Sequence, residues 1–224
     1  MSKKPKNKVK KVKDNTTRNI TIGMVLLVLA TGVFFSIYSK NIDSKVAYPK
    51  SATVGKVSPI TFNNDVTDKV IDIWEDPQCP VCMKFETVVG DYVNELIDSK
   101  KAQVRYHVLS FLGPESRALA NALACSADDG KFRDFHSYLY KNQRPENSGF
   151  WNSENIKIAY SSISTSKEFI SCVDENKYAN YVSKVAADGM KEKVNSTPTV
   201  FVNGNEINRN TDYFNIEAFK KVTS

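Results

Sequence analysis

The chain has 224 residues, enough for one ordinary domain with a tail, and its 41% hydrophobic and 25% charged residues are typical of a globular protein. The formal net charge is +6, but residues 1–19 alone carry eight basic side chains and one acidic side chain, a net of +7. The rest of the chain therefore sums to about −1, which excludes the basic face that nucleic-acid binding requires.

Residues 20–38 form an uncharged apolar run directly after the basic tail of residues 1–19. Such a run, folded as a helix, rises about 28 Å, close to the hydrocarbon thickness of a bilayer, so we expect a transmembrane helix. The basic tail keeps the N-terminus in the cytoplasm and places the rest of the chain outside. A cleaved signal peptide is the alternative, but the apolar core is longer than in signal peptides and no A-x-A pattern follows it. We therefore expect a single-pass cell-membrane protein with an uncleaved signal-anchor helix.

Residues 39–58 contain Ser, Lys, Pro and Gly with little periodicity, so we expect a tether between the membrane and a domain at residues 59–224. Residues 70–74 are a short β-branched run that predicts a strand. A helical pattern follows over residues 85–97, and residues 103–109 predict a second strand. This β-α-β unit normally belongs to a parallel sheet covered by helices.

Residues 113–193 change character, because Ala-rich and apolar positions recur there at helical spacing. We expect a helical subdomain of four or five helices, inserted into the α/β domain. Its clearest helical segments are residues 117–126, 132–140, 156–160 and 178–190. Residues 199–202 then predict a strand, Asn203-Gly204 a two-residue hairpin turn, and residues 216–222 a closing helix.

The motif Cys79-Pro80-Val81-Cys82 stands where the first predicted strand gives way to a helix. A cysteine at a helix N-terminus faces free backbone N–H groups and the positive end of the helix dipole, which lower its pKa. Pro80 suits the first helical position, and the i, i+3 spacing puts both sulfurs on one face of the first turn. We assign Cys79 as the nucleophile and Cys82 as the resolving thiol of thiol–disulfide exchange. The alternatives are half a zinc site, whose second ligand pair the sequence lacks, and a structural bridge across too small a loop.

Three blocks of sequence carry a family resemblance. They are Asp76-x-x-Cys79-Pro80-x-Cys82, Ala120-x-x-x-Ala124-Cys125 running to Gly130-Lys131-Phe132-x-x-Phe135-His136, and Thr197-Pro198-Thr199-Val200-Phe201-Val202-Asn203-Gly204. With these blocks in this order, residues 55–222 resemble the DsbA-like branch of the thioredoxin superfamily. The resemblance implies a thioredoxin-like α/β fold with an inserted helical subdomain and a cis Pro198 beside the two cysteines. Thr197 would then offer its backbone to a substrate strand, and Pro80 and Val81 would support the site.

The sequence departs from the family pattern at one position. Family members usually place a buried acid on the strand six residues before the nucleophile, where this chain has Ile73. Asp72, Glu75 and Asp76 are near, and each either substitutes through water or is a solvated turn charge, so the general base stays unassigned. His136 lies on an aromatic helix face, which predicts core packing rather than catalysis.

Four cysteines in a domain outside the cytoplasm favour oxidation of all of them. With Cys79 and Cys82 paired, the remaining pair is Cys125 and Cys172, each on a predicted helix. A bridge between them would close a loop of about 48 residues, and this closure would stabilise the fold by about 4 kcal/mol in the chain-entropy model. The alternative is two buried free thiols.

We expect an oxidase that introduces disulfides into reduced secreted or membrane proteins, because Pro80 directly after the nucleophile resembles the oxidising branch of the family. A thiol reductase or disulfide isomerase outside the cytoplasm is the alternative, and a membrane-tethered chaperone or peptide-binding module is an alternative of another class. By resemblance, a quinone-linked membrane oxidase would reoxidise the pair. No cofactor or metal is expected, since the cysteines carry the electrons themselves.

Overall fold

The computed structural model describes residues 46–223. The basic tail at residues 1–19, the expected transmembrane helix at residues 20–38 and the first part of the expected tether at residues 39–45 lie outside the described residues. Among the residues described, no helix combines the length and apolarity needed to cross a membrane.

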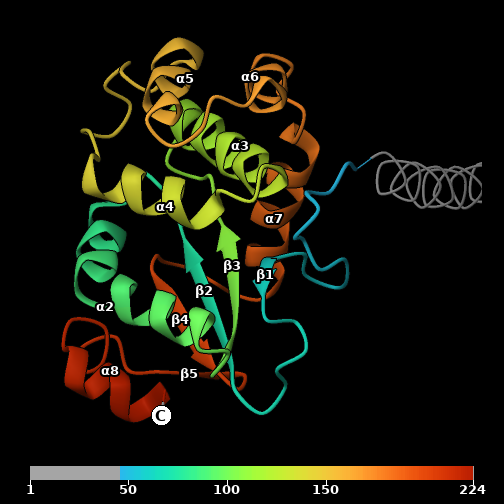
Figure 1. Cartoon of the computed structure of the whole chain (residues 1–224). Coiled ribbons are helices and arrows are strands. Elements are labelled where there is room, and N and C mark those ends of the chain that lie inside the picture. Colours follow the sequence, from blue (N-terminus) through green and yellow to red (C-terminus); the bar gives the residue numbers. More distant parts are fainter. Residues whose placement is uncertain (1–45, 224) are drawn as a thin grey trace, which may run out of the picture. The chain divides into compact units, whose positions relative to one another are not determined.

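One mixed sheet organises the described part of the chain (Figure 1). Its strands are β1 (Ile60–Phe62), β2 (Val70–Glu75), β3 (Gln103–Val108), β4 (Thr199–Val202) and β5 (Asn205–Glu206). Their order across the sheet is β1-β3-β2-β4-β5. The central strands β2 and β3 run parallel, with Ile73 opposite Tyr106, while β1, β4 and β5 pair antiparallel with their neighbours. The predicted β-α-β unit is therefore confirmed, and β1 is a strand that the sequence did not reveal.

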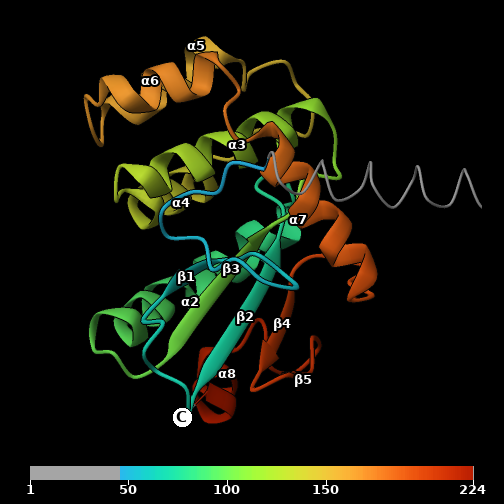
Figure 2. The same ribbon diagram turned by 90° about the vertical axis from the view of Figure 1, so that its right-hand side faces the viewer.

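Helices cover both faces of the sheet and one end of it. They are α2 (Pro80–Asp98), α3 (Pro114–Asp128), α4 (Phe132–Lys141), α5 (Ser153–Ser161), α6 (Lys167–Asp174), α7 (Ala179–Lys191) and α8 (Ile216–Thr223). Helices α2 and α8 lie on one face and α7 on the other, and α3 to α6 gather beyond the ends of β2 and β3 (Figures 1 and 2). The five helices α3 to α7 fall between β3 and β4, where the sequence predicts an inserted helical subdomain.

Residues 46–58 belong to the folded domain, which corrects the prediction of a tether reaching residue 58. Ala52 forms an isolated antiparallel β-bridge with Ile60, the first residue of β1. The centroid of the Tyr48 ring lies 5.9 Å from that of the Tyr181 ring on α7. Apolar side chains of this segment pack against the core. Tertiary contacts, rather than a helix or a strand of its own, hold this segment in place. Its sequence therefore shows no helical or strand periodicity and resembles a linker.

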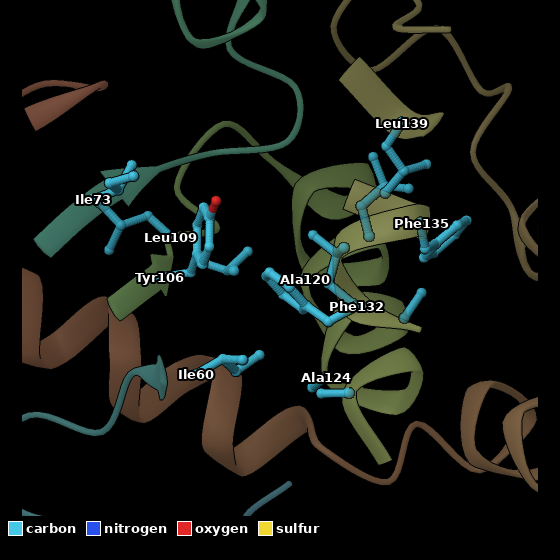
Figure 3. Packing of buried hydrophobic residues seen from close by; sticks show 14 of the residues in the cluster. Ile60, Ile73, Tyr106, Leu109, Ala120, Ala124, Phe132, Phe135 and Leu139 are labelled. Carbon is cyan, nitrogen blue, oxygen red and sulfur yellow. The ribbon is translucent and has the colours of Figure 1, made fainter. Parts of the chain in front are cut away.

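The hydrophobic core joins the sheet to α4 (Figure 3). Ile73 is fully buried, and its neighbour across the strands, Tyr106, packs its ring 5.2 Å from that of Phe132. Burying such large side chains stabilises the fold by about 1.5–3 kcal/mol each. Ile73 therefore contributes packing at the position where family members usually carry an acid.

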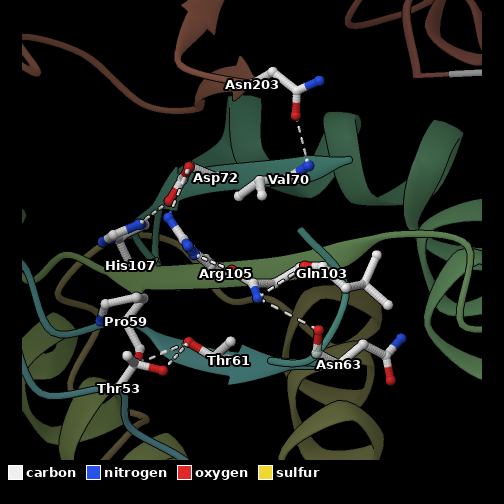
Figure 4. Close-up of polar contacts among 11 residues, drawn as sticks. Thr53, Pro59, Thr61, Asn63, Val70, Asp72, Gln103, Arg105, His107 and Asn203 are labelled. Carbon is white, nitrogen blue, oxygen red and sulfur yellow. Dashed lines mark hydrogen bonds and ion pairs between the residues drawn. The ribbon is translucent and has the colours of Figure 1, made fainter. Parts of the chain in front are cut away.

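The opposite face of the sheet carries a polar cluster (Figure 4). The His107 imidazole lies 2.8 Å from the Asp72 carboxylate, Arg105 lies 3.8 Å from the same carboxylate, and the His107 ring stacks on Trp74. Because successive strand residues point to opposite faces, Asp72 faces away from Ile73. His107 and Arg105 therefore hold the Asp72 carboxylate on the sheet face opposite Ile73.

Cys125 on α3 and Cys172 on α6 are joined by a disulfide, with their Cα atoms 5.9 Å apart. The bridge ties together two helices of the inserted subdomain. It closes a loop with a sequence separation of 47 residues, long enough for a large effect on the unfolded chain.

Replacing both Cys125 and Cys172 with Ala should lower the unfolding free energy by about 4 kcal/mol. Thermal denaturation should show a melting temperature lower by about 10 °C, because about 1 kcal/mol corresponds to 2–4 °C at this size. Ser171→Ala, an exposed change on the same helix, is the matched control. An unchanged melting temperature in the double variant would contradict a stabilising role for the bridge.

Candidate active site

Cys79 occupies the N-cap of α2, directly after the turn that ends β2. Its sulfur accepts the backbone N–H of Cys82 at 3.4 Å, and Pro80 takes the first helical position, as the sequence predicts. Both cysteines are free thiols in this structure. Cys79 is buried apart from a small exposed fraction of 7%, whereas Cys82 is fully buried. The cysteine that solvent reaches is therefore Cys79, at the helix N-terminus.

The peptide bond between Thr197 and Pro198 is cis, and it lies directly before β4. Thr199 of β4 pairs with Trp74 of β2, so the cis bond lies at the same sheet edge as the cysteine motif. As a result, the Thr197 carbonyl oxygen lies 3.6 Å from the Cys79 sulfur, close enough to accept the thiol hydrogen. The structure thus brings together Cys79, Cys82, Thr197 and Pro198, which the sequence singled out separately.

The two sulfurs have opposite acid–base properties. A hydrogen bond from the Cys82 thiol outweighs burial and, helped by the Thr197 side chain and by the backbone N–H groups of Val81 and Cys82, lowers the pKa of Cys79 to about 6. Burial, together with the hydrogen bond and charge of Cys79 and the charge of Glu75, raises the pKa of Cys82 far above its ordinary value. Cys79 can therefore exist as a thiolate at neutral pH, while Cys82 must keep its proton until a base removes it.

Asp76 fixes the turn that carries the cysteines. Its carboxylate accepts the backbone N–H of Gln78 at 3.0 Å, that of Leu112 at 3.3 Å, and the hydroxyl of Ser116. The side chain is fully buried, and burial raises its pKa against the effect of these hydrogen bonds. Asp76 therefore links the active-site turn to the loop after β3, and it is not the solvated turn charge that the sequence allowed.

A second contact holds the same turn from the other side. The Gln143 side-chain amide donates to the carbonyl oxygens of Pro77 at 3.0 Å and Cys79 at 3.1 Å. Because Gln143 follows α4, the inserted helical subdomain contacts the backbone of the nucleophile directly.

A buried acid is present after all, two residues along from the expected position. Glu75 lies on the same sheet face as Ile73, because strand residues two apart share a face. It is fully buried, and its carboxylate is hydrogen-bonded to the imidazole of His136. His136 is buried, as the sequence predicts, but it is paired with an acid rather than only packed among aromatic rings.

Glu86 is the site residue that sequence reasoning missed. It lies four residues after Cys82 on α2, and its carboxylate is 3.9 Å from Nδ1 of His136. The available signal was a charge within the apolar face marked by Phe85 and Val89. That signal was ambiguous, because only the packing of α4 onto α2 shows that Glu86 is covered.

Apolar side chains are exposed in the first turn of α2, next to Cys79. Pro80 is exposed, and Val81 and Met83 in the first turn of α2 expose 43% and 36% of their surface. Phe111, in the loop that Asp76 ties to the active-site turn, exposes 55%. These side chains offer contact area to an extended peptide that approaches Cys79.

The family model described as Thioredoxin matches residues 59–221, most of the chain. The chain belongs to the thioredoxin family. The described architecture agrees with this assignment, since the sheet carries the cysteine motif after β2 and the cis-proline before β4. The resemblance inferred from the three sequence blocks is thereby confirmed for the fold.

Several relatives are named for disulfide chemistry. A probable disulfide bond formation protein D of Bacillus cereus is 28% identical over 203 residues, which cover 84% of this chain and 87% of the relative. The structure of oxidised DsbA of Mycobacterium tuberculosis is 27% identical with a TM-score of 0.57, covering 70% of this chain and 83% of that one. The structure of oxidised BdbD of Bacillus subtilis, 20% identical, superposes with a TM-score of 0.65 over 80% of this chain and 97% of that one. The last of these shows similarity of fold.

In the reduced protein, the Cys79 thiolate should titrate with a pKa of about 6, as followed by its ultraviolet absorbance. Cys82→Ala should raise that pKa toward the ordinary cysteine value of about 8.5, because the largest stabilising hydrogen bond is lost. Cys79→Ser should remove the titration altogether and serves as the control. A midpoint near the ordinary value in the unaltered protein would contradict this assignment.

Proposed function

We propose that this protein is a thiol–disulfide oxidoreductase that introduces disulfides into reduced secreted or membrane proteins. The observation that carries the proposal is the unequal pair of sulfurs, a low-pKa Cys79 beside the cis Thr197-Pro198 bond and a fully buried Cys82. The names of the relatives, a disulfide bond formation protein and a DsbA, support the same activity.

The exchange starts from the oxidised pair. A substrate thiolate attacks the Cys79 sulfur, the bond to Cys82 breaks, and Cys82 leaves with the electron pair. A second substrate thiolate then attacks the mixed disulfide, forms the substrate disulfide and releases Cys79 as a thiolate. Two electrons thus pass from the substrate to the cysteine pair, so the exchange itself requires no bound cofactor or metal.

The low pKa of Cys79 favours this direction. A depressed pKa stabilises the folded dithiol protein above the ordinary cysteine pKa, and this stabilisation is lost as the pH falls through about 6. Stabilising the dithiol form makes the disulfide a stronger oxidant. In a reductase the disulfide form would have to be the more stable of the two forms. Oxidation of substrates is therefore the direction that the site favours.

Substrate recognition uses the backbone beside Cys79 and the exposed apolar side chains near it. The backbone at Thr197, next to the Cys79 sulfur, can pair with an extended substrate segment, which orders the substrate cysteine beside Cys79. Val81 and Phe111 then contact neighbouring apolar side chains. Unfolded secreted chains, which expose both backbone and apolar residues, suit such a site.

The membrane anchor and the reoxidising partner complete the proposal. Residues 20–38 anchor the protein in the cell membrane, with the N-terminus in the cytoplasm and the catalytic domain outside. A quinone-linked membrane oxidase reoxidises Cys79 and Cys82, and the anchor keeps both partners in one plane. The basic tail at residues 1–19 sets the topology and the near-neutral remainder gives no nucleic-acid surface.

The purified full chain, oxidised in advance, should restore activity to a reduced protein that needs disulfides, and Cys79→Ser should abolish this refolding. The Cys125→Ala/Cys172→Ala variant, assayed well below its melting temperature, is the control and should retain the activity. Equal refolding by Cys79→Ser and the unaltered chain would exclude the enzyme and would favour a chaperone or peptide-binding module.

A further inference from the structure

The backbone that lies beside Cys79 comes from a loop rather than from a strand. The loop joins α7, which ends at Lys191, to β4, which begins at Thr199. It contains Thr197, whose carbonyl oxygen lies 3.6 Å from the Cys79 sulfur. If a substrate segment is to pair with Thr197, this loop must already be in place, because ordering it at the moment of binding would cost free energy.

Strand pairing holds the end of this loop on one side only. On that side β2 pairs with β4 as far as Thr199, which lies opposite Trp74. On the other side β5 pairs only with Phe201 and Val202 of β4. Within residues 46–223, Thr199 and Val200 therefore have no strand neighbour on the β5 side. Another part of the chain must hold the start of β4 there.

The segment that follows β5 covers this gap. Oη of Tyr213 accepts the backbone N–H of Val200 at 2.7 Å, and the N–H of Ile207 donates to the Val200 carbonyl oxygen at 3.1 Å. Tyr213 is fully buried, and the centroid of its ring lies 5.5 Å from that of the Phe85 ring on α2. The start of β4 is thereby connected to the helix that carries the two cysteines.

Arg209, from the same segment, is bonded to both ends of the stretch that contains Thr197. Its Nη2 donates to Oγ of Ser196 at 2.6 Å and to Oγ1 of Thr199 at 3.1 Å. Oγ1 of Thr199 in turn donates to the Ser196 carbonyl oxygen at 2.7 Å. The three hydrogen bonds form a closed ring that spans residues 196–199. We call Ser196, Thr199 and Arg209 the polar clasp.

The Arg209 side chain is supported by its own segment. Its guanidinium carbon lies 5.5 Å from the centroid of the Tyr213 ring, a distance at which an aromatic face attracts a cation. The backbone around it is closed by two hydrogen bonds, in which the N–H of Asp212 donates to the Asn208 carbonyl oxygen and the N–H of Asn208 donates to the Asp212 carboxylate, each at 2.8 Å. Because an arginine side chain loses much rotamer freedom when it is fixed, this support makes the polar clasp less costly to form.

Packing alone does not explain the polar clasp. Ser196 is exposed and Arg209 is only half-buried, so these two side chains add little to the apolar core. Their hydrogen bonds instead fix the residues on either side of Thr197 and Pro198. The clasp therefore acts on the piece of backbone that lies next to the nucleophile.

We propose that Arg209 is a positioning residue for the substrate: through Ser196 and Thr199 it holds the Thr197 backbone where an extended substrate segment pairs with it. Arg209 takes no part in the transfer of electrons or protons between the sulfurs. The role rests on the proposed thiol–disulfide exchange and names the residue that prepares its peptide-binding backbone. A substrate with peptide backbone around its cysteine should depend on Arg209, whereas a small dithiol should not.

The rate at which the oxidised full chain transfers its disulfide tests this role. Two reductants are compared in single-turnover reactions: a reduced, unstructured peptide with two cysteines, and dithiothreitol, a dithiol without a peptide backbone. The reactions are quenched with acid, and the reduced protein is quantified by mass spectrometry. Arg209→Ala should lower the second-order rate constant for the peptide about tenfold, because losing one charge-assisted hydrogen bond costs about tenfold in an equilibrium constant. The rate constant for dithiothreitol should not change.

A methylated peptide tests whether Arg209 acts through backbone pairing. N-methylation of the residues that flank the peptide's cysteines removes the N–H groups that such pairing uses. In the unaltered protein, methylation should slow the reaction about tenfold. In Arg209→Ala it should have little further effect, because the two changes remove the same interaction. Additive effects would show that Arg209 acts on something other than this pairing.

Three further variants separate positioning from a general structural role. Thr199→Val removes one hydroxyl group of the polar clasp, keeps the β-branched shape, and should slow the peptide reaction as Arg209→Ala does. Arg209→Lys keeps the charge without the planar fork and should recover part of the rate. Asn210→Ala changes the exposed neighbour of Arg209 and should match the unaltered protein with both reductants. Circular dichroism spectra should be normal in all of them.

Either of two results would overturn the role of Arg209: an equal loss of rate with the peptide and with dithiothreitol, or an unaltered peptide rate in Arg209→Ala. If the unaltered protein oxidised neither reductant, the proposed exchange activity itself would be refuted instead. The two failures are therefore distinguishable.

Discussion

The contact that the site depends on is the one between the Cys79 sulfur and the first turn of α2. The thiol and the backbone N–H of Cys82 both donate to this sulfur and stabilise its thiolate, and the carbonyl oxygen of Thr197 lies 3.6 Å from it at the cis bond. Both positions follow from the central strand, because β2 leads into α2 at its end and pairs there with the start of β4. The sheet register thus sets the chemistry of the nucleophile.

This arrangement also makes the two sulfurs differ in their burial and in the stability of their thiolates. Cys79 reaches the surface and is stabilised as a thiolate, whereas Cys82 lies one turn deeper, where a charge is disfavoured. An exchange reaction needs both properties, since the outer sulfur must be attacked and released easily and the inner one must be protected from solvent. The inserted helices complete this environment, because α4 carries His136 against Glu75, and Gln143, two residues after the end of α4, binds the backbone of the motif.

Local patterns in the sequence predicted the parts of the fold that depend on local structure. The β-branched run of β2, the turn to α2 and the Asn203-Gly204 hairpin each carry their own signal, and three short blocks sufficed to indicate the fold. Strand β1 has three residues and too little pattern to detect, and residues 46–58 are ordered only through contacts such as that of Tyr48 with Tyr181. The pairing of Glu75 with His136 joins residues 61 positions apart, so no local pattern could reveal it. The family expectation of an acid at Ile73 pointed to the correct sheet face but to the wrong residue.

The central claim is that stabilisation of the Cys79 thiolate makes the Cys79–Cys82 disulfide an oxidant. The reduction potential of the full chain, equilibrated with reduced and oxidised glutathione, tests it most directly. We expect a value near that of the strongly oxidising members of the superfamily, about −120 mV. A value near that of reducing thioredoxins, about −270 mV, would contradict the account and would assign the protein to the reductases.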